Sequence, residues 1–88
     1  MPKLFYSKRF EKNLARFLNK YPELESVVKE KLRALSSNPK NSSLKTHKLT
    51  GKLKNFYSIY ITYEYRVVFY LNKNNIYLVA MGTHDEVY

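Results

Sequence analysis

Apolar residues recur at helical spacing through the first half of the chain. Ser7 has the side chain of an N-cap, and the apolar residues after it are separated by three or four positions. This pattern predicts a helix that ends at about Asn19 or Lys20. A second stripe of the same period follows Pro22 and closes at the Ser-Ser-Asn-Pro sequence of residues 36–39. Two adjacent amphipathic helices with these faces form a helical hairpin that must bury one side.

The second half of the chain changes to the alternating pattern of β-strands. After a polar stretch from Lys40 to Asn55, which we expect to be a loop, three runs rich in aromatic and β-branched residues follow: Phe56–Thr62, Tyr65–Leu71 and Ile76–Met81. Lys3–Tyr6 adds a short edge strand before the helices. The resulting βααβββ order predicts one α+β domain of two layers, in which the helical hairpin packs on one face of an antiparallel sheet.

Strand parity assigns one charged residue to the middle of this sheet. The uniformly apolar positions should meet the helices, so Arg66 and Tyr60 should lie together on the opposite face. A guanidinium on a central strand is costly to desolvate unless it meets an anion, and its planar fork suits a phosphate. Alternatively, Arg66 is structural and pairs with Glu64, Asp85 or Glu86, or reaches solvent. The sequence leaves both interpretations open.

The charge of the chain indicates an acidic or polyanionic partner. Sixteen Lys and Arg against seven Asp and Glu give a net charge of +9 in 88 residues. Four lysines of the polar stretch could follow a phosphate backbone: Lys45, Lys48, Lys52 and Lys54. There is no cysteine, no apolar run of the length that a membrane span needs, and no signal peptide pattern. We therefore expect a cytoplasmic protein without a membrane partner.

His47 and His84 are the only histidines, and an imidazole can give or take a proton near neutral pH. Tyr88, the last residue, can stack on a base, donate its hydroxyl to a phosphate, or simply pack the end of the chain. Neither a metal site nor a cofactor is expected, because the ligand spacing for zinc and the carboxylates for two metals are missing. Cleavage of a phosphodiester without metal is simplest on RNA, where the 2′-hydroxyl is an internal nucleophile.

Three motifs resemble a known family of toxins. HKLTG begins at His47, YRVVFYL spans Tyr65–Leu71, and GTHDEVY spans Gly82–Tyr88. In this order and spacing the chain resembles the RelE/ParE superfamily of bacterial type II toxins, and within it the YafQ- and RelE-like messenger-RNA endonucleases. The resemblance implies a ribosome-dependent RNase that cuts mRNA in the A site of the 70S ribosome. It also implies a free monomer that is held silent by a cognate acidic antitoxin.

The resemblance implies roles for four residues of the motifs. His47 corresponds to a histidine implicated as general base, and His84 to one implicated as general acid. Arg66 corresponds to the arginine that holds the scissile phosphate. Tyr88 corresponds to a terminal tyrosine that stacks on the substrate or orients it.

The rest of the resemblance is less regular. Lys52 and Lys54 correspond to basic residues that contact the RNA backbone and 16S ribosomal RNA, and Glu64 corresponds loosely to an acidic residue of the strand hairpin. Two positions depart from the pattern, because Tyr60 replaces a second histidine of YafQ-like members and Ser43 replaces a glutamate used as base in YoeB-type toxins. The general base therefore stays open between the histidine of HKLTG, Lys54 and Glu64.

Two other functions fit the same scaffold. A ParE-type toxin inhibits DNA gyrase without cutting RNA, but such toxins lack the acid–base residues at the C-terminus. A module that binds RNA or protein through a vestigial site would explain the two departures. We expect the endonuclease, and the gyrase inhibitor and the vestigial module are the alternatives.

Overall fold

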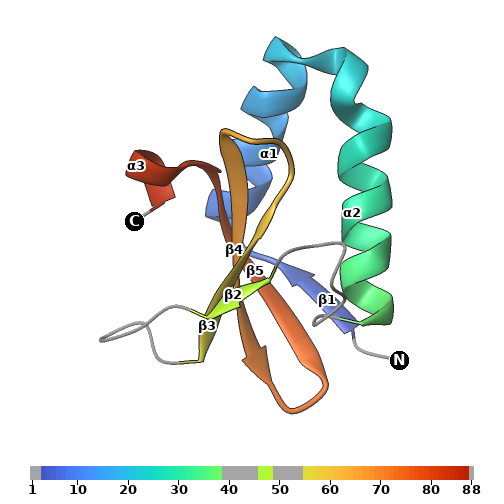
Figure 1. Cartoon of the computed structure of the whole chain (residues 1–88), viewed down its shortest axis with the longest axis vertical. Helices are drawn as coiled ribbons and strands as arrows, with labels where there is room; N and C mark the ends of the chain where they lie inside the picture. Colours follow the sequence, from blue (N-terminus) through green and yellow to red (C-terminus); the bar gives the residue numbers. More distant parts are fainter. Residues whose placement is uncertain (1–2, 39–45, 49–54, 88) are drawn as a thin grey trace.

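The computed structural model of the chain describes residues 3–38, 46–48 and 55–87, without the side chains at 47, 48 and 84. Within these residues, one strand, the helices and then four strands follow in an order close to the expected one, and a short helix comes last (Figure 1). In chain order the elements are β1 (Lys3–Tyr6), α1 (Lys8–Lys20), the 3₁₀ helix η1 (Pro22–Leu24), α2 (Glu25–Ser37), β2 (His47–Lys48), β3 (Phe56–Tyr60), β4 (Tyr65–Asn72), β5 (Asn75–Thr83) and α3 (His84–Val87).

The described strands form a five-stranded sheet in the order β1-β5-β4-β3-β2. The two hairpins β3–β4 and β4–β5 are antiparallel, as expected, and β1 pairs in parallel with β5. The α+β fold class is confirmed, but the sheet is mixed rather than wholly antiparallel. A parallel pair needs a crossover connection, and here most of the chain, including both long helices, lies between β1 and β5.

The expectation of a continuous loop from Lys40 to Asn55 is wrong at one place. His47 and Lys48 form β2, which pairs antiparallel with β3 through the register His47 to Ser58 and Lys48 to Tyr57. Two residues carry no periodicity of their own, so the strand exists only because the edge of β3 offers a partner. The polar composition of the segment gave no sign of this pairing.

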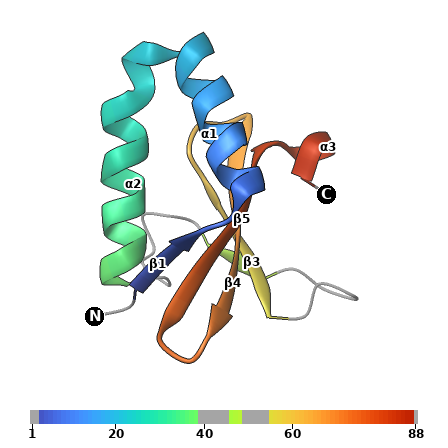
Figure 2. The ribbon, with the colours of Figure 1, turned by 180° about the vertical axis from the view of Figure 1, so that it is seen from behind.

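Side-chain hydrogen bonds set the start of α1. Ser7 is its N-cap, as expected, and its Oγ accepts from the backbone N–H of Phe10 at 3.0 Å. The second helix begins later than expected, because Pro22 opens one turn of 3₁₀ helix and α2 starts at Glu25. Both helices cover the same side of the sheet, as the view from behind shows (Figure 2).

The hydrophobic core lies between these helices and one face of the sheet. Val67 and Phe69 of β4 are fully buried there, and they alternate with Arg66 and Val68, which belong to the other face. Further buried side chains come from both helices, from β3 and the turn after it, and from β5: Phe10, Phe17, Val28, Leu32, Leu35, Ile59, Ile61, Ile76, Leu78 and Met81. We call the opposite side of the sheet the outer face.

The outer face is defined by the strand register. Its members alternate with the core residues on each strand and pair with one another across strands: Phe5 on β1, Phe56, Ser58 and Tyr60 on β3, Arg66, Val68 and Tyr70 on β4, and Tyr77, Ala80 and Gly82 on β5. A β-bulge leaves Val79 as an extra residue on β5, because Phe69 pairs with Leu78 and Val68 with Ala80. The bulge changes the parity of the strand and thereby brings Gly82 to the outer face, opposite Arg66.

Candidate active site on the outer face of the sheet

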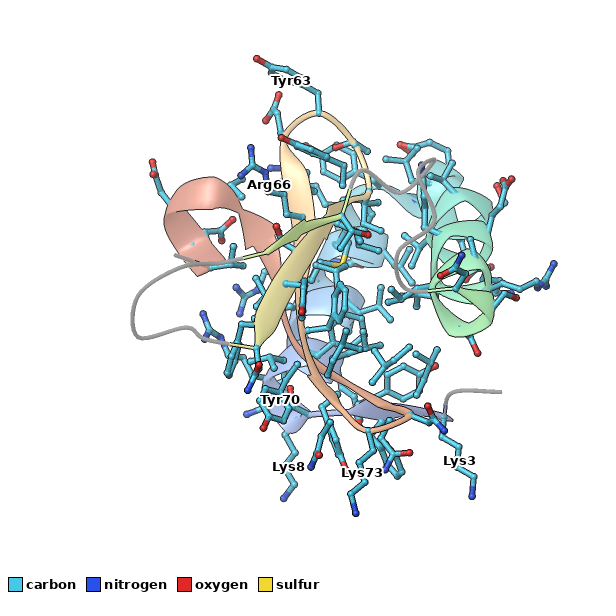
Figure 3. All side chains as sticks on the ribbon, turned by 60° about the horizontal axis from the view of Figure 1, so that its bottom comes forward. Lys3, Lys8, Tyr63, Arg66, Tyr70 and Lys73 are labelled. Carbon is cyan, nitrogen blue, oxygen red and sulfur yellow. The ribbon has the colours of Figure 1, made fainter. Side chains whose placement is uncertain are left out.

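Arg66 is held against a tyrosine of the neighbouring strand, as the parity argument predicted. Its Nη2 donates a hydrogen bond to the hydroxyl of Tyr60 at 3.1 Å. The guanidinium carbon lies 4.7 Å from the centre of the same ring, close enough for a cation–π interaction. Its Nε is buried, and the side chain projects from β4 toward the side of the sheet where α3 lies (Figure 3). A central strand and an aromatic neighbour therefore orient this cation.

The register places Arg66 beside the start of α3. Tyr60, Arg66 and Gly82 pair across β3, β4 and β5, and β5 ends one residue later at Thr83. His84 is the first residue of α3. The backbone of one sequence motif, GTHDEVY, thus begins next to the arginine of another, YRVVFYL.

A carboxylate fixes the turn from β5 into α3. Oε1 of Glu86 accepts from the backbone N–H and from the hydroxyl of Thr83, both at 2.9 Å. These hydrogen bonds, the one from the backbone first, lower the pKa of the Glu86 carboxyl below its usual value. The side chain packs over Gly82, where an added Cβ would lie only 3.1 Å from the Cβ of Glu86. Arg9 of α1 also reaches this helix and donates to the backbone carbonyl of Glu86 at 3.0 Å.

Sequence reasoning missed this function of Thr83 and Glu86. The signal was present, because a threonine followed by a glutamate three positions later is the signature of a capping box at a helix N-terminus. From the sequence, His84 and Tyr88 are assigned to chemistry, and Glu86 is only a possible ion-pair partner of Arg66. In the structure, the GTHDEVY motif forms the short helix α3, which Glu86 connects to the end of β5 by hydrogen bonds.

His47 lies on the strand at the other side of β3. Its backbone pairs with Ser58, which pairs with Val68 and through it with Ala80. This row lies two residues along the strands from that of Arg66, on the same face. The structure thus brings the backbones of three candidates near one another. His47 and Arg66 lie on strands of one sheet, and His84 follows directly after β5, the strand that pairs with that of Arg66. Lys48 follows in β2. Four further candidates lie outside the described residues: Lys45, Lys52, Lys54 and Tyr88.

Glu64 lies in the turn between β3 and β4, where it is exposed and lines a cavity of about 390 Å³. The other walls come from α1, the end of β5 and α3, and they include Arg16, Lys20 and Glu86. A hydrogen bond with Tyr21 raises the pKa of Lys20, and a hydrogen bond with Tyr21 and then burial raise the pKa of Tyr65. The described contacts do not join Glu64 to Arg66, and its role as a base stays a prediction.

No group of three metal-ligating side chains occurs within residues 3–38, 46–48 and 55–87. In the same part of the chain, no helix has the length and apolar character needed to cross a membrane.

Comparison with solved structures finds close likeness among bacterial toxins. A copper-bound mutant toxin from Helicobacter pylori matches with a TM-score of 0.84 at 26% identity, and all of both chains is covered. YafQ from Escherichia coli BL21(DE3) matches with 0.82 at 18% identity over 100% of this chain and 99% of its own. A YoeB/ParE toxin from Agrobacterium tumefaciens matches with 0.81 at 16% identity over 93% and 98%. The last two show the shared fold.

The family comparison agrees with the structural one. Residues 2–88 match the family described as bacterial toxin of type II toxin-antitoxin system, YafQ. No protein of curated function matches the sequence. Since the family match extends over nearly the whole chain, the chain belongs to the YafQ family of type II toxin–antitoxin toxins.

Proposed function

We propose that this toxin is a ribosome-dependent endoribonuclease that cleaves mRNA in the A site without a metal ion. The observation that carries the proposal is the position of Arg66. Its guanidinium is oriented by Tyr60 on the outer face of the sheet. Arg66 pairs with Gly82 of β5, and α3 begins at His84, two residues after Gly82. An arginine fork on the strand beside the start of this helix can hold a phosphate next to an acid–base residue.

The proposed reaction is an in-line attack within the RNA. The 2′-oxygen forms a bond to phosphorus, and the bond from phosphorus to the 5′-oxygen breaks. Arg66 stabilises the negative charge that develops on the phosphorane, and His84 gives a proton to the departing 5′-oxygen. Tyr88 stacks on the substrate or orients it.

The base that removes the 2′-proton is one of three residues in this proposal. His47 fits best, because β2 carries its backbone into a row of the sheet only two residues from that of Arg66. Lys54 and Glu64 are the other two candidates. Lysines 45, 48, 52 and 54 would bind the RNA backbone and 16S ribosomal RNA without reading sequence.

A cognate acidic antitoxin completes the proposal. The family is defined by toxin–antitoxin systems, and one similar structure is that of the Escherichia coli DinJ–YafQ complex, with a TM-score of 0.79 at 19% identity. A net charge of +9 favours an acidic partner. An antitoxin that is partly disordered and folds on binding would cover the site.

The proposal is tested by primer extension on a defined message bound to 70S ribosomes. We expect cuts in the A site with the unaltered protein. Arg66→Ala should lower the rate of cleavage by two to three orders of magnitude, since oriented charge stabilisation of this kind contributes that much, with ribosome binding almost unchanged. His84→Ala should abolish the cuts.

The matched control is Arg33→Ala, which removes an exposed arginine of α2, the helix that covers the opposite face of the sheet, and this variant should cleave like the parent. Equal loss of binding and cleavage in Arg66→Ala would place Arg66 in docking rather than chemistry. An intact message together with growth arrest would reject the nuclease and favour gyrase as the target. An intact message without growth arrest would favour a vestigial binding module.

A further inference from the structure

Four aromatic rings cross the outer face of the sheet in one line, at the end opposite Arg66. Phe5 on β1 pairs with Tyr77 on β5, Tyr77 pairs with Tyr70 on β4, and Tyr70 pairs with Phe56 on β3. The distances between successive ring centres are 5.0, 6.1 and 5.1 Å. We call these four residues the aromatic row.

The aromatic row is not part of the hydrophobic core. The core rings Phe10 and Phe69 are fully buried, whereas 42% of Phe5 is exposed and Phe56, Tyr70 and Tyr77 are only partly buried. Phe5 stacks on Tyr77 with an angle of 17° between the rings. Since β1 is the edge strand, none of the described strands lies beyond Phe5. The row of rings therefore ends in a stacked pair, Phe5 on Tyr77, whose outer ring is exposed, and a planar ligand could extend this pair.

Contacts between the rings strengthen the sheet, since cross-strand aromatic pairs are stabilising in themselves. Stability does not explain the basic residues that lie near the row. Lys3 lies on the same strand face as Phe5, two residues before it, and Lys73 lies in the turn that follows β4. Figure 3 shows both lysines and Lys8 at the same end of the molecule as Tyr70. None of the described strands contains an aspartate or a glutamate.

We propose that the aromatic row, with Lys3 and Lys73, binds single-stranded nucleic acid outside the catalytic site. Bases stack on the row from its exposed end at Phe5, and the lysines contact phosphates. Aromatic rings on a sheet with basic residues around them are suited to unpaired bases, whose faces are open, and not to a duplex, whose bases already stack on one another.

The position of the row relative to Arg66 supports this assignment. Phe56 and Tyr60 belong to the same face of β3 and are four residues apart, as are Tyr70 and Arg66 on β4. At the rise of an antiparallel strand this is about 13 Å. A single strand of a few nucleotides is long enough to reach from the row to Arg66, past the buried residues Ser58, Val68 and Ala80 that lie between them. The inference does not depend on cleavage, because a surface that binds RNA can exist on an active or an inactive toxin.

Binding is measured by fluorescence anisotropy with a labelled ten-nucleotide 2′-O-methyl RNA of mixed sequence. This probe has no 2′-hydroxyl nucleophile, so the measurement is independent of the proposed nuclease, and either proposal can fail alone. We expect Phe5→Leu, which keeps an apolar side chain but removes the ring, to weaken binding about tenfold. Phe5→Tyr, which keeps a ring, should bind like the parent. Tyr70→Leu should also weaken binding.

The slope of affinity against salt concentration separates stacking from charge. Phe5→Leu should leave this slope unchanged, whereas Lys73→Asn should reduce it by about one. Asparagine suits this position, because Lys73 has a φ of 57° and asparagine tolerates that conformation. The matched control is Tyr63→Leu, which removes a tyrosine that is 93% exposed in the turn at the other end of β4 and should not change binding.

Two results would overturn the proposal. One is equal affinity of Phe5→Leu, Tyr70→Leu and Tyr63→Leu, which would leave the row as reinforcement of the sheet. The other is equal affinity of the parent for the single strand and for a duplex of the same sequence, which would indicate binding by charge alone. Thermal melting followed by circular dichroism checks that Phe5→Leu is folded, and the edge position of β1 makes this substitution the mildest in the row.

Discussion

Glu86 ties the last turn of the chain to the sheet through one oxygen atom. Its carboxylate accepts two hydrogen bonds from Thr83, and its side chain packs in the space that Gly82 leaves open. This arrangement explains why the motif needs glycine, threonine and glutamate together. The glycine leaves room for the carboxylate, the threonine supplies two donors, and His84 is thereby placed at the head of α3.

The lowered pKa of Glu86 predicts a pH dependence of stability. A carboxyl whose pKa is depressed in the folded state stabilises the fold above its unfolded pKa, and this contribution is lost as pH falls through the folded pKa. Glu86→Gln should therefore lose less stability than the parent between pH 6 and pH 3, because a neutral amide does not titrate. Urea denaturation at several pH values measures the free energy of unfolding.

The control for this prediction is Glu23→Gln, which alters an exposed glutamate of η1 and should keep the parental pH dependence. Parallel stability curves for Glu86→Gln and the parent over the acid range would show that Glu86 does not hold the turn in solution.

At the scale of elements, α1 takes the place of a missing strand along part of β5. β1 covers β5 only from Asn75 to Leu78. Beyond that point, Ser7 donates from its Oγ to the carbonyl of Val79 at 2.7 Å, and Oδ1 of Asn13 accepts from the backbone N–H of Met81 at 3.0 Å. Two polar side chains of the first helix thus continue the hydrogen bonding that an edge strand would provide.

Asn13→Ala should destabilise the protein by about 1–3 kcal/mol, because the N–H of Met81, a residue only 3% exposed, would lose its acceptor. Asn13→Asp keeps an acceptor at the same place and should retain most of the stability, and Asn19→Ala on the exposed side of α1 should be nearly neutral. The midpoint of urea denaturation reports these differences at an unchanged slope. If Asn13→Ala and Asn19→Ala were equally stable, this contact would not hold α1 on the sheet.

The elements that carry their own pattern were the ones that the sequence predicted. The N-cap at Ser7, the helical stripes and the alternation of β3, β4 and β5 depend on neighbouring residues, so they can be recognised locally. The partners with which strands pair cannot be recognised from neighbouring residues. The two residues of β2, the parallel docking of β1 and the extra residue Val79 all depend on strands distant in sequence.

The candidate site divides in the same way. Parity alone put Arg66 with Tyr60 on the face away from the helices, and the hydrogen bond between them confirms it. The approach of His47 to Ser58 follows from a pairing that no local pattern announces. The aromatic row escaped notice for the same reason, since its members lie on four strands and meet only through the register.

Over the whole molecule, the two faces of the sheet differ in what they carry. The inner face and both long helices supply the core. The outer face carries Arg66 at one end and the aromatic row at the other. The net charge of +9 belongs to the molecule as a whole, and it acts over distances larger than any one contact.

This charge predicts how the proposed antitoxin finds the toxin. Opposite charges steer two proteins toward each other, so the association rate constant should fall at least tenfold as salt rises from 50 to 500 mM. The dissociation rate constant should change much less, because it depends on contacts already made, and it serves as the internal control in stopped-flow or surface-based kinetics. An association rate that does not respond to salt, with tight binding preserved, would show that the charge serves RNA alone and that the antitoxin recognises the toxin through apolar contacts.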